Sequence, residues 1–471
     1  MIKASDKKNV IAVVLTNIST ILVNVLTCLF LPKIMNIDDY SLYRTFLLYS
    51  SYSGLLSFGL IHGIYIKYGS LNFDALPEEH FRYYNRLLII ITILSYIFLS
   101  AILFISKSHL SYKQYITFVF IAFNIPIINI RCYFSSINQF TKNFTKDAVL
   151  LISHYCLTFL MIISMAVFSK TTYIYTLIIS PAIIIFSSTL SLCQNRTLVF
   201  GKYTIPSKAN IFVLLKKGIA FMVSEHIGLL ILNVDCIFVN IFYSSTDFAM
   251  YSFSATLISG IYMIVSIISN LIYPYLSRID SKKYLKYYNI SSNILCIVTI
   301  LLLSSFYIMK MFIEHFLPLY KNCISILSIL YCTIIFRSLL LLVSCNFFKV
   351  LKCSRAYTTI NSIALLLCSC LDLFICLSSS HITYIAFSSL CTFIIWYVIS
   401  EIVLCYKLKN SIKYTWKRYL FIILSIVIFL FYLKFKPMFA FILYVLSIAL
   451  IIFILYRKML IQILNKTNTH I

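Results

Sequence analysis

Long apolar runs separated by short polar segments dominate this sequence, and they limit the possible folds more than any other feature. Hydrophobic residues make up 61% of the 471 residues and charged residues only 11%, against about 25% charged residues in soluble domains. An α-helix needs about 20 apolar residues to cross a bilayer. The sequence therefore predicts an all-α polytopic membrane protein with about fourteen transmembrane helices. The expected spans are Asn9–Leu31, Leu42–Ile66, Leu87–Ser106, Tyr115–Asn138, Ala148–Phe168, Thr172–Cys193, Ile219–Phe242, Met250–Tyr273, Asn289–Met309, Asn322–Phe347, Tyr357–Leu377, Ile382–Cys405, Tyr419–Leu433 and Met438–Tyr456.

The distribution of Lys and Arg predicts how these spans are oriented. With the N-terminus inside, 28 of the 39 Lys and Arg lie in cytoplasmic segments, 8 lie in outward loops and the other three lie within spans. Because cytoplasmic loops carry an excess of Lys and Arg, we expect both termini to be cytoplasmic. The first apolar run lacks a small-residue cleavage site, so we expect it to remain as a span. The net charge of +25 does not indicate nucleic acid binding, because no basic face forms.

A short pattern occurs twice and indicates an internal repeat. The pattern Asp-aromatic-x-aliphatic-Tyr occupies residues 39–43 and again residues 247–251, which is 208 residues later. Asn138 and Asn346 have the same separation. Repeats of this kind decide the architecture of a fold. We expect two homologous six-helix lobes, related by a parallel pseudo-twofold axis as in many transporters.

The repeat predicts the domain organisation. Residues 1–193 hold spans 1–6 and form the expected N-terminal lobe. Residues 194–218 form a cytoplasmic connection, and residues 219–405 hold spans 7–12 as the C-terminal lobe. Residues 406–471, with spans 13 and 14, lie outside the repeat.

Three motifs give the chain a resemblance to a known family. The Asp-x-x-x-Tyr pattern follows spans 1 and 7, Asn233-Val234-Asp235 lies within span 7, and residues 316–320 (FLPLY) lead into span 10. With two six-helix lobes, these motifs resemble the polysaccharide transporters of the multidrug/oligosaccharidyl-lipid/polysaccharide exporter superfamily. Within that superfamily the chain looks most like the O-antigen flippases of the Wzx type. The resemblance covers about residues 9–405.

The resemblance implies a multi-pass protein of the bacterial inner membrane. Such a protein moves undecaprenyl-pyrophosphate-linked O-antigen or polysaccharide repeat units from the cytoplasmic to the periplasmic leaflet. It implies a V-shaped pair of lobes around a central cavity and alternating access. We expect a polymerase and a chain-length regulator of the same pathway as partners. We expect no enzymatic activity, cofactor, metal or nucleic acid partner.

Two other functions compete with flipping. One is a drug or cation antiporter of the same fold, which would need buried carboxylates and aromatic residues in the N-terminal lobe. The other is a membrane-embedded polymerase or glycosyltransferase. Such an enzyme needs a large periplasmic loop, whereas every outward loop predicted here is short.

Three arginines lie within predicted spans and are the candidate substrate-binding residues. Arg131 and Arg337 lie toward the cytoplasm in spans 4 and 10, and Arg44 lies toward the periplasm in span 2. A charge within a span costs roughly 3 kcal/mol and is a functional candidate by default. Because guanidinium binds phosphate oxygens bidentately, we expect Arg131 and Arg337 to bind pyrophosphate. The alternative is that they snorkel or pair with Glu225.

Acidic residues within the predicted spans occur only in the C-terminal lobe. Glu225 and Asp235 lie in span 7, and Asp372 lies in span 11. A desolvated carboxylate can take up a proton or bind Na⁺, so these residues are candidates for ion coupling, with His226 as a proton relay. The alternative is that the acids are counter-ions for the arginines and that His226 is only hydrogen-bonded.

The repeated pattern has a structural interpretation. Asp39 and Asp247 each lie just before a span, where a carboxylate can accept hydrogen bonds from free backbone N–H groups and favour the helix dipole. Tyr43 and Tyr251 complete the two caps. The rival interpretation is that Asp38 and Asp39 are the acidic pair of a lipid-sugar-dependent glycosyltransferase. The repeat argues against it, because Asp247 occupies the same position without an acidic neighbour.

Small residues and prolines add two structural expectations. Gly59 and Gly63 form a GxxxG sequence, which is typical of closely packed helices. Pro126 and Pro181 lie deep within spans, where each can kink its helix.

Overall fold

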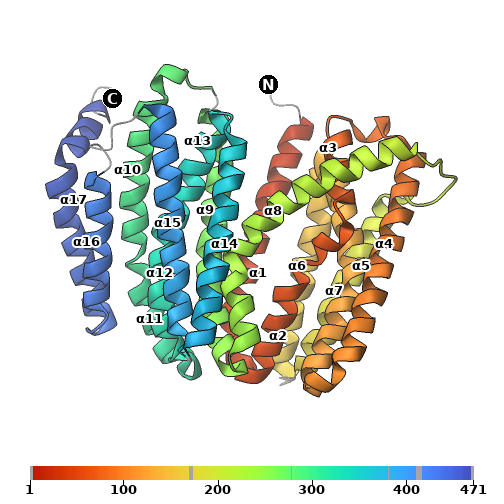
Figure 1. Ribbon diagram of the computed structural model, residues 1–471, viewed down its shortest axis with the longest axis horizontal. Helices are drawn as coiled ribbons and strands as arrows, with labels where there is room; N and C mark the ends of the chain where they lie inside the picture. Colours follow the sequence, from red (N-terminus) through yellow and green to blue (C-terminus); the bar gives the residue numbers. More distant parts are fainter. Residues whose placement is uncertain (1–3, 169–172, 277, 380, 410–415, 468–471) are drawn as a thin grey trace. The chain divides into compact units, whose positions relative to one another are not determined.

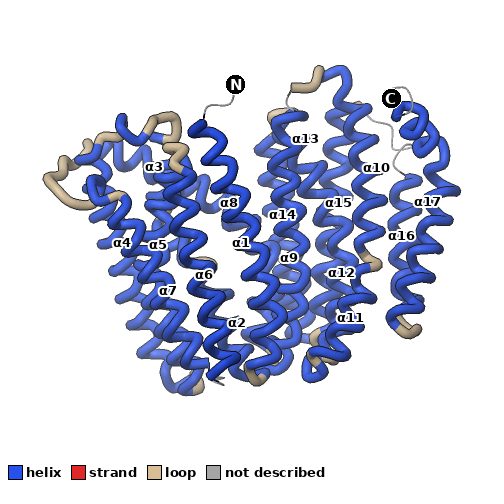
Figure 2. Tube along the Cα trace, turned by 180° about the vertical axis from the view of Figure 1, so that it is seen from behind, coloured by secondary structure: helices blue, strands red, loops and turns tan. Residues whose placement is uncertain are grey.

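The computed structural model describes residues 4–168, 173–276, 278–379, 381–409 and 416–467 of the chain. Twelve helices in this part are long and apolar enough to cross a membrane, and none of the described residues forms a strand. Figure 2 shows helices joined by loops. The predicted fold class, an all-α polytopic membrane protein, is confirmed. The chain divides into two compact units, one of residues 1–233 with 244–249 and one of residues 234–243 with 250–471.

Unit 1 contains the helices of the first six predicted spans and most of the seventh. They are α1 (Ala4–Ile34), α2 (Ile37–Ser50), α3 (Leu60–Tyr68), α4 (Glu78–Ile105), α5 (Tyr112–Phe140), α6 (Phe144–Phe168), α7 (Tyr173–Gln194) and the first part of α8 (Lys208–Phe242). In Figure 1 these elements run from red to yellow-green. The central helix is α5, which packs against α4, α7 and α2.

The second predicted span is not one helix, which corrects the expected span Leu42–Ile66. The chain leaves α2 at Ser50, forms a 3-10 turn over Ser53–Ser57 and resumes as α3 at Leu60. Between the turn and α3, Phe58 (φ 46°) and Gly59 (φ 74°) have left-handed backbone conformations. Only glycine adopts such a conformation without steric cost. Hydropathy alone does not reveal this break, because the broken segment is still apolar.

Neighbouring side chains stabilise the broken span. A break frees backbone carbonyls, and buried carbonyls need donors. Asn129 of α5 donates a hydrogen bond to the Ser53 carbonyl (3.0 Å) and a second to the Ile125 carbonyl of its own helix (2.9 Å). The helix α5 is continuous through Pro126, as α7 is through Pro181.

Glycines hold α3 against α8 at backbone distance, so the predicted close packing is confirmed. A Cβ atom on Gly218 would lie 2.0 Å from the Gly59 carbonyl oxygen and 2.7 Å from the Gly63 nitrogen. A Cβ atom on Gly63 would lie 2.4 Å from the Leu214 carbonyl oxygen. The GxxxG sequence therefore packs on α8.

Unit 2 is built around α12 (Cys323–Leu339), nearly all of whose side chains are buried. The helix continues through a π-turn at Leu340–Ser344 into α13 (Cys345–Val350). The other helices are the C-terminal part of α8, α9 (Ser245–Leu276, from Met250 on), α10 (Tyr284–Leu302), α11 (Ser305–Phe316), α14 (Ser354–Ser378), α15 (Thr383–Leu408), α16 (Trp416–Tyr432) and α17 (Pro437–Thr467).

The last two helices are integral parts of unit 2. The Tyr307 hydroxyl of α11 donates to the Phe429 carbonyl of α16 (2.9 Å), and the Tyr444 hydroxyl of α17 donates to the Ile300 carbonyl of α10 (3.1 Å). Arg418 of α16 forms a buried ion pair with Glu401 of α15. At 17 residues, α16 is slightly shorter than the usual span of about 20 residues.

Candidate functional site

A cavity of about 850 Å³ lies inside unit 1. Its walls come from α1, α2, α3, α5, α6, α7 and α8, and from the 3-10 turn that interrupts the second span. The lining includes many hydroxyl, imidazole and charged groups, although these helices are apolar overall. The imidazole, amide and charged side chains among them are Asn24, His62, Asn129, Arg131, Gln139, His154, Glu225 and His226. Several serines of the broken span and of α5 add hydroxyl groups.

Arg131 reaches the cavity because α5 has two distinct faces. Ile128, Arg131, Cys132, Ser135 and Gln139 all line the cavity. Their spacing of three or four residues is that of a single helix face. The other face of α5, with Tyr133, Phe134 and Ile137, packs into the core with α3 and α4. The arginine is thus fixed on the wall of the cavity and not in the core.

Among the described residues no carboxylate lies within 4.0 Å of the Arg131 guanidinium, and Asp147 interacts with its charge only from a greater distance. The acid that lines the cavity is Glu225, and it is engaged elsewhere. A guanidinium in low-dielectric surroundings is costly unless it is paired or hydrated. The cavity therefore favours an anion near Arg131.

Glu225 is held by a histidine from the broken span. His62 Nε2 of α3 lies 2.8 Å from Glu225 Oε2 of α8, at the place where the glycines bring the two helices together. The neighbouring His226 Nδ1–H donates to the Met222 carbonyl of its own helix (2.9 Å). The His226 ring lies 6.5 Å from the His62 ring. Glu225 and His226 thus belong to a cluster that links α3 to α8.

A buried carboxylate also lies behind the α5 wall. Asp147, in the first turn of α6, accepts hydrogen bonds from Ser135 Oγ (2.5 Å) and Gln139 Nε2 (3.0 Å). Both donors line the cavity. Asp147 therefore orients two polar cavity groups.

Two further predicted residues, Asp235 and Asp372, lie together in unit 2. Asp235 accepts hydrogen bonds from the Tyr251 hydroxyl (2.7 Å) and from Ser389 Oγ (3.0 Å). Asp372 accepts from Ser388 Oγ, so consecutive residues of α15 hold the two acids. The carboxylates are close enough to interact electrostatically. Among the described residues neither carboxylate has a Lys, Arg or His within 4.0 Å.

The chemistry of this pair suits a proton or a small cation. Two like charges in a buried site cannot both stay ionised without compensation. Oxygen ligands from carboxylates and hydroxyls are those that hard cations prefer. The described residues contain no group of three or more His, Cys, Asp or Glu that could hold a metal ion.

The other two predicted arginines lie elsewhere. Arg337 of α12 is buried in unit 2, with its guanidinium carbon 5.2 Å from the centre of the Trp396 ring and its Nε without a hydrogen-bond partner. Arg44 of α2 is half-buried and does not line the cavity. Of the three arginines, the structure brings Arg131 to the unit 1 cavity.

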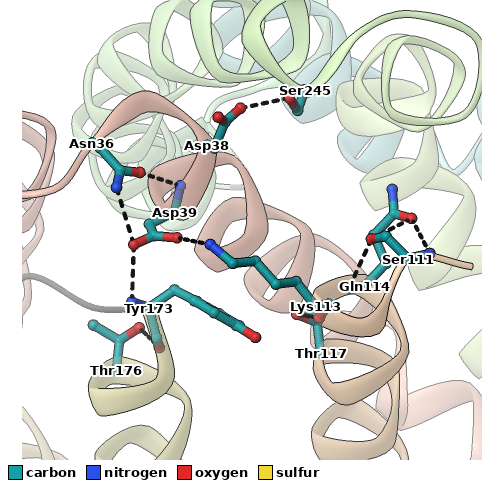
Figure 3. Close-up of polar contacts among 10 residues, drawn as sticks. All are labelled: Asn36, Asp38, Asp39, Ser111, Lys113, Gln114, Thr117, Tyr173, Thr176 and Ser245. Carbon is teal, nitrogen blue, oxygen red and sulfur yellow. Dashed lines mark hydrogen bonds and ion pairs between the residues drawn. The ribbon is translucent and has the colours of Figure 1, made fainter.

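The first repeated aspartate ties three helices together (Figure 3). The N-cap of α2 is Asn36, whose Oδ1 accepts from the Asp39 backbone N–H (2.7 Å). The Asp39 carboxylate lies 3.2 Å from Lys113 Nζ of α5 and accepts from the backbone N–H of Tyr173, the first residue of α7 (3.4 Å). The beginnings of α2, α5 and α7 therefore meet at this carboxylate.

The second repeated aspartate has a similar local arrangement. Ser244 Oγ accepts from the Asp247 backbone N–H (3.2 Å) and donates to the Asp247 carboxylate (2.7 Å) at the start of α9. In both copies the side chain of the cap residue accepts from the backbone N–H of an aspartate three positions later, as in a capping box, and donates to the carboxylate of that aspartate. The tyrosines differ, because Tyr251 binds Asp235 whereas Tyr43 lines the cavity.

Comparison with known proteins agrees with this architecture. The profile of the family described as polysaccharide biosynthesis protein matches residues 6–280. The chain belongs to this polysaccharide biosynthesis protein family. The resemblance to polysaccharide transporters that the sequence motifs indicate is confirmed at the level of the family. None of the curated proteins matches the chain in sequence.

Solved structures share the fold of this family member. The lipid II flippase MurJ in an inward closed conformation has a TM-score of 0.69 at 17% identity, covering 96% of this chain and 99% of MurJ. An inward-facing multidrug resistance MATE transporter of the MOP superfamily has a TM-score of 0.63 at 11% identity, covering 84% and 99%. An outward-facing MATE transporter has a TM-score of 0.52 at 11% identity, covering 86% and 96%. At these identities the likeness concerns the fold.

The structure of this polysaccharide biosynthesis protein places at or beside the cavity three residues that the sequence patterns do not single out. They are His62, His154 and Asp147. The signal for His62 was present, because it lies inside the GxxxG sequence that predicts contact with another helix. Asp147 lies just outside the expected span, which begins at Ala148, whereas α6 begins at Phe144.

Proposed function

We propose that this protein translocates a lipid-linked glycan that carries a pyrophosphate, with Arg131 binding the pyrophosphate in the unit 1 cavity. The observation that supports this most is the guanidinium of Arg131, which lies on the wall of a cavity of about 850 Å³ with no carboxylate of the described residues within 4.0 Å. Arginine is the side chain best suited to bind phosphate oxygens bidentately. Membership of the polysaccharide biosynthesis protein family supports a glycan as the cargo.

The proposed substrate is an undecaprenyl-pyrophosphate-linked O-antigen or polysaccharide repeat unit in the bacterial inner membrane. The hydroxyl and amide groups of the cavity would bind sugars, while the polyprenyl tail would stay in the lipid. The two lobes predicted from the repeat would alternate between inward and outward access. A polymerase and a chain-length regulator would use the exported unit.

Asp235 and Asp372 are proposed as the site that couples transport to H⁺ or Na⁺. Both carboxylates lie among hydroxyl groups, and neither has a basic partner in the described part of unit 2. A ligand shifts a conformational equilibrium only if it binds the two states with different affinity. An ion that neutralises the pair in one state would provide this difference.

The buried acid pair is also the observation that favours a second candidate function, a drug or cation antiporter. The unit 1 cavity argues against it. Its lining contains one arginine and three histidines, and its acid, Glu225, is bound by His62. Such a lining does not attract a cationic drug. An enzymatic function receives no support from Asp38 and Asp39, because Ser245 Oγ donates to Asp38 and Lys113 pairs with Asp39.

The experiment is complementation of a strain that lacks its flippase and makes the matching lipid-linked repeat unit. Arg131→Lys should retain part of the surface polysaccharide, because lysine keeps the positive charge that attracts the pyrophosphate. Arg131→Ala removes this charge and should retain almost none. Arg355→Ala, which removes an exposed arginine, is the control and should export normally. If Arg131→Ala reaches the membrane at the normal level and exports normally, the proposed site is wrong.

A further inference from the structure

The segment of residues 194–218, between α7 and the apolar part of α8, combines basic and exposed apolar side chains. It contains five basic residues and no Asp or Glu. Phe200, Ile205 and Phe212 expose 71%, 66% and 67% of their surface. Water alone is a poor environment for three large apolar side chains on one short segment, and exposed apolar groups rimmed by polar ones mark interaction sites.

This exposure does not result from a loose loop. Arg82 of α4 donates to the Thr197 carbonyl (2.7 Å) and to the Lys202 carbonyl (3.0 Å). The guanidinium of Arg86 lies 4.2 Å from the centre of the Tyr203 ring. The loop is therefore fixed on α4 while Phe200 and Ile205 point away from the protein.

A glycine allows this fit. Gly201 has a φ of +124°, and a Cβ atom there would lie 3.0 Å from the Arg82 guanidinium. Leu198 anchors the same loop in the core of unit 1. The fixed conformation indicates that the outward direction of the apolar side chains is built into the fold.

The length of α8 places its first turns outside the hydrocarbon. Its 35 residues span roughly 52 Å at 1.5 Å per residue, whereas the hydrocarbon core is about 30 Å thick. The chain turns directly from the end of α8 at Phe242 into α9 at Ser245, so the excess length lies at the N-terminal end. In Figure 1 this end of α8 runs obliquely across the ends of α4 and α5.

The first turns of α8 are amphipathic. Leu214 and Gly218 face the protein and are buried. Phe212, Lys216 and Lys217 are exposed. Basic amphipathic helices of this kind lie in the membrane interface, with their apolar side chains at the boundary between headgroups and acyl chains.

We propose that residues 200–217 form a binding surface for anionic phospholipid in the headgroup layer of the cytoplasmic leaflet. The apolar side chains would reach the acyl boundary, and Lys202, Lys208, Lys216 and Lys217 would attract anionic headgroups electrostatically. The absence of acidic residues from the segment gives it the charge complementary to such lipids. This proposal does not depend on what the cavity transports.

The test is tryptophan quenching in the full-length protein reconstituted in liposomes. Phe200→Trp is introduced together with Trp416→Phe, which leaves the buried Trp396 as the other tryptophan. Lipids brominated near the headgroup end of the acyl chain are added as phosphatidylglycerol or as phosphatidylcholine at equal mole fraction. Quenching by the anionic lipid should exceed quenching by the zwitterionic lipid about twofold or more.

Two triple variants distinguish a local surface from a general effect of charge. Lys202→Gln with Lys208→Gln and Lys216→Gln should abolish the preference for the anionic lipid. The matched control removes three exposed lysines of another predicted cytoplasmic loop, Lys282, Lys283 and Lys286, and should leave the preference unchanged. Equal quenching by the two lipids, no quenching by either, or equal effects of the two triple variants would overturn the proposal.

Discussion

The substitution Gly218→Ala tests whether α3 and α8 are in backbone contact. The added Cβ would lie 2.0 Å from the Gly59 carbonyl oxygen and 2.7 Å from the Gly63 nitrogen. Both atoms belong to the backbone and cannot rotate away, so α3 and α8 must separate. Overpacking of this kind costs about 1–3 kcal/mol, partly offset by the roughly 1 kcal/mol that alanine gains over glycine within a helix.

The matched control is Gly228→Ala on the same helix. A Cβ at Gly228 meets no atom within 4 Å, so this change should be neutral or stabilising by up to about 1 kcal/mol. The melting temperatures of the two purified variants in the same detergent should differ by about 1–3 °C, with Gly218→Ala the lower. In Gly218→Ala, the separation of α3 from α8 should also break the contact between His62 and Glu225 and reduce export. Equal melting temperatures would refute the close contact.

Three further predictions follow from other parts of the chain. Glu401→Gln should lower the amount of folded protein in the membrane, because breaking a buried ion pair costs about 3–5 kcal/mol, and combining Arg418→Met with Glu401→Leu should restore much of it. Asp235→Asn should leave the membrane level unchanged but remove the dependence of export on the ion gradient, whereas an unchanged dependence would exclude this carboxylate from coupling. A cysteine introduced at Ser245 should react with an impermeant thiol reagent from outside, and one introduced at Lys208 should not. Labelling at Lys208 would mean that the predicted topology is inverted.

The sequence was sufficient for the fold class and for the approximate position of most spans, because both depend on the length and polarity of long segments. It did not predict the break between α2 and α3. That break depends on local backbone conformation at Phe58 and Gly59 and on the contact of Gly59 with α8, and a window of mean hydropathy averages over such details. Three glycines within ten residues, Gly54, Gly59 and Gly63, were the available signal.

The candidate site was only partly predictable for a similar reason. Arg131 and Glu225 stand out in the sequence because each is a charge within an apolar run. Their partners do not, since the hydrogen bond between His62 and Glu225 joins residues 163 positions apart. Likewise, the side chains that hold Asp235 include Ser389 from a distant helix, and a serine in an apolar run carries no sign of its partner.

The most direct test of the central claim is flipping by the purified protein. Proteoliposomes would contain a fluorescent polyprenyl-pyrophosphate-linked glycan, and a membrane-impermeant reagent would report how much of it reaches the opposite leaflet. Wild-type protein should move the lipid well above the rate of protein-free liposomes, Arg131→Lys at a reduced rate and Arg131→Ala at the background rate. Wild-type protein at the background rate, with the substrate and ion gradient present, would contradict the proposed function. A normal rate for Arg131→Ala would contradict the proposed site.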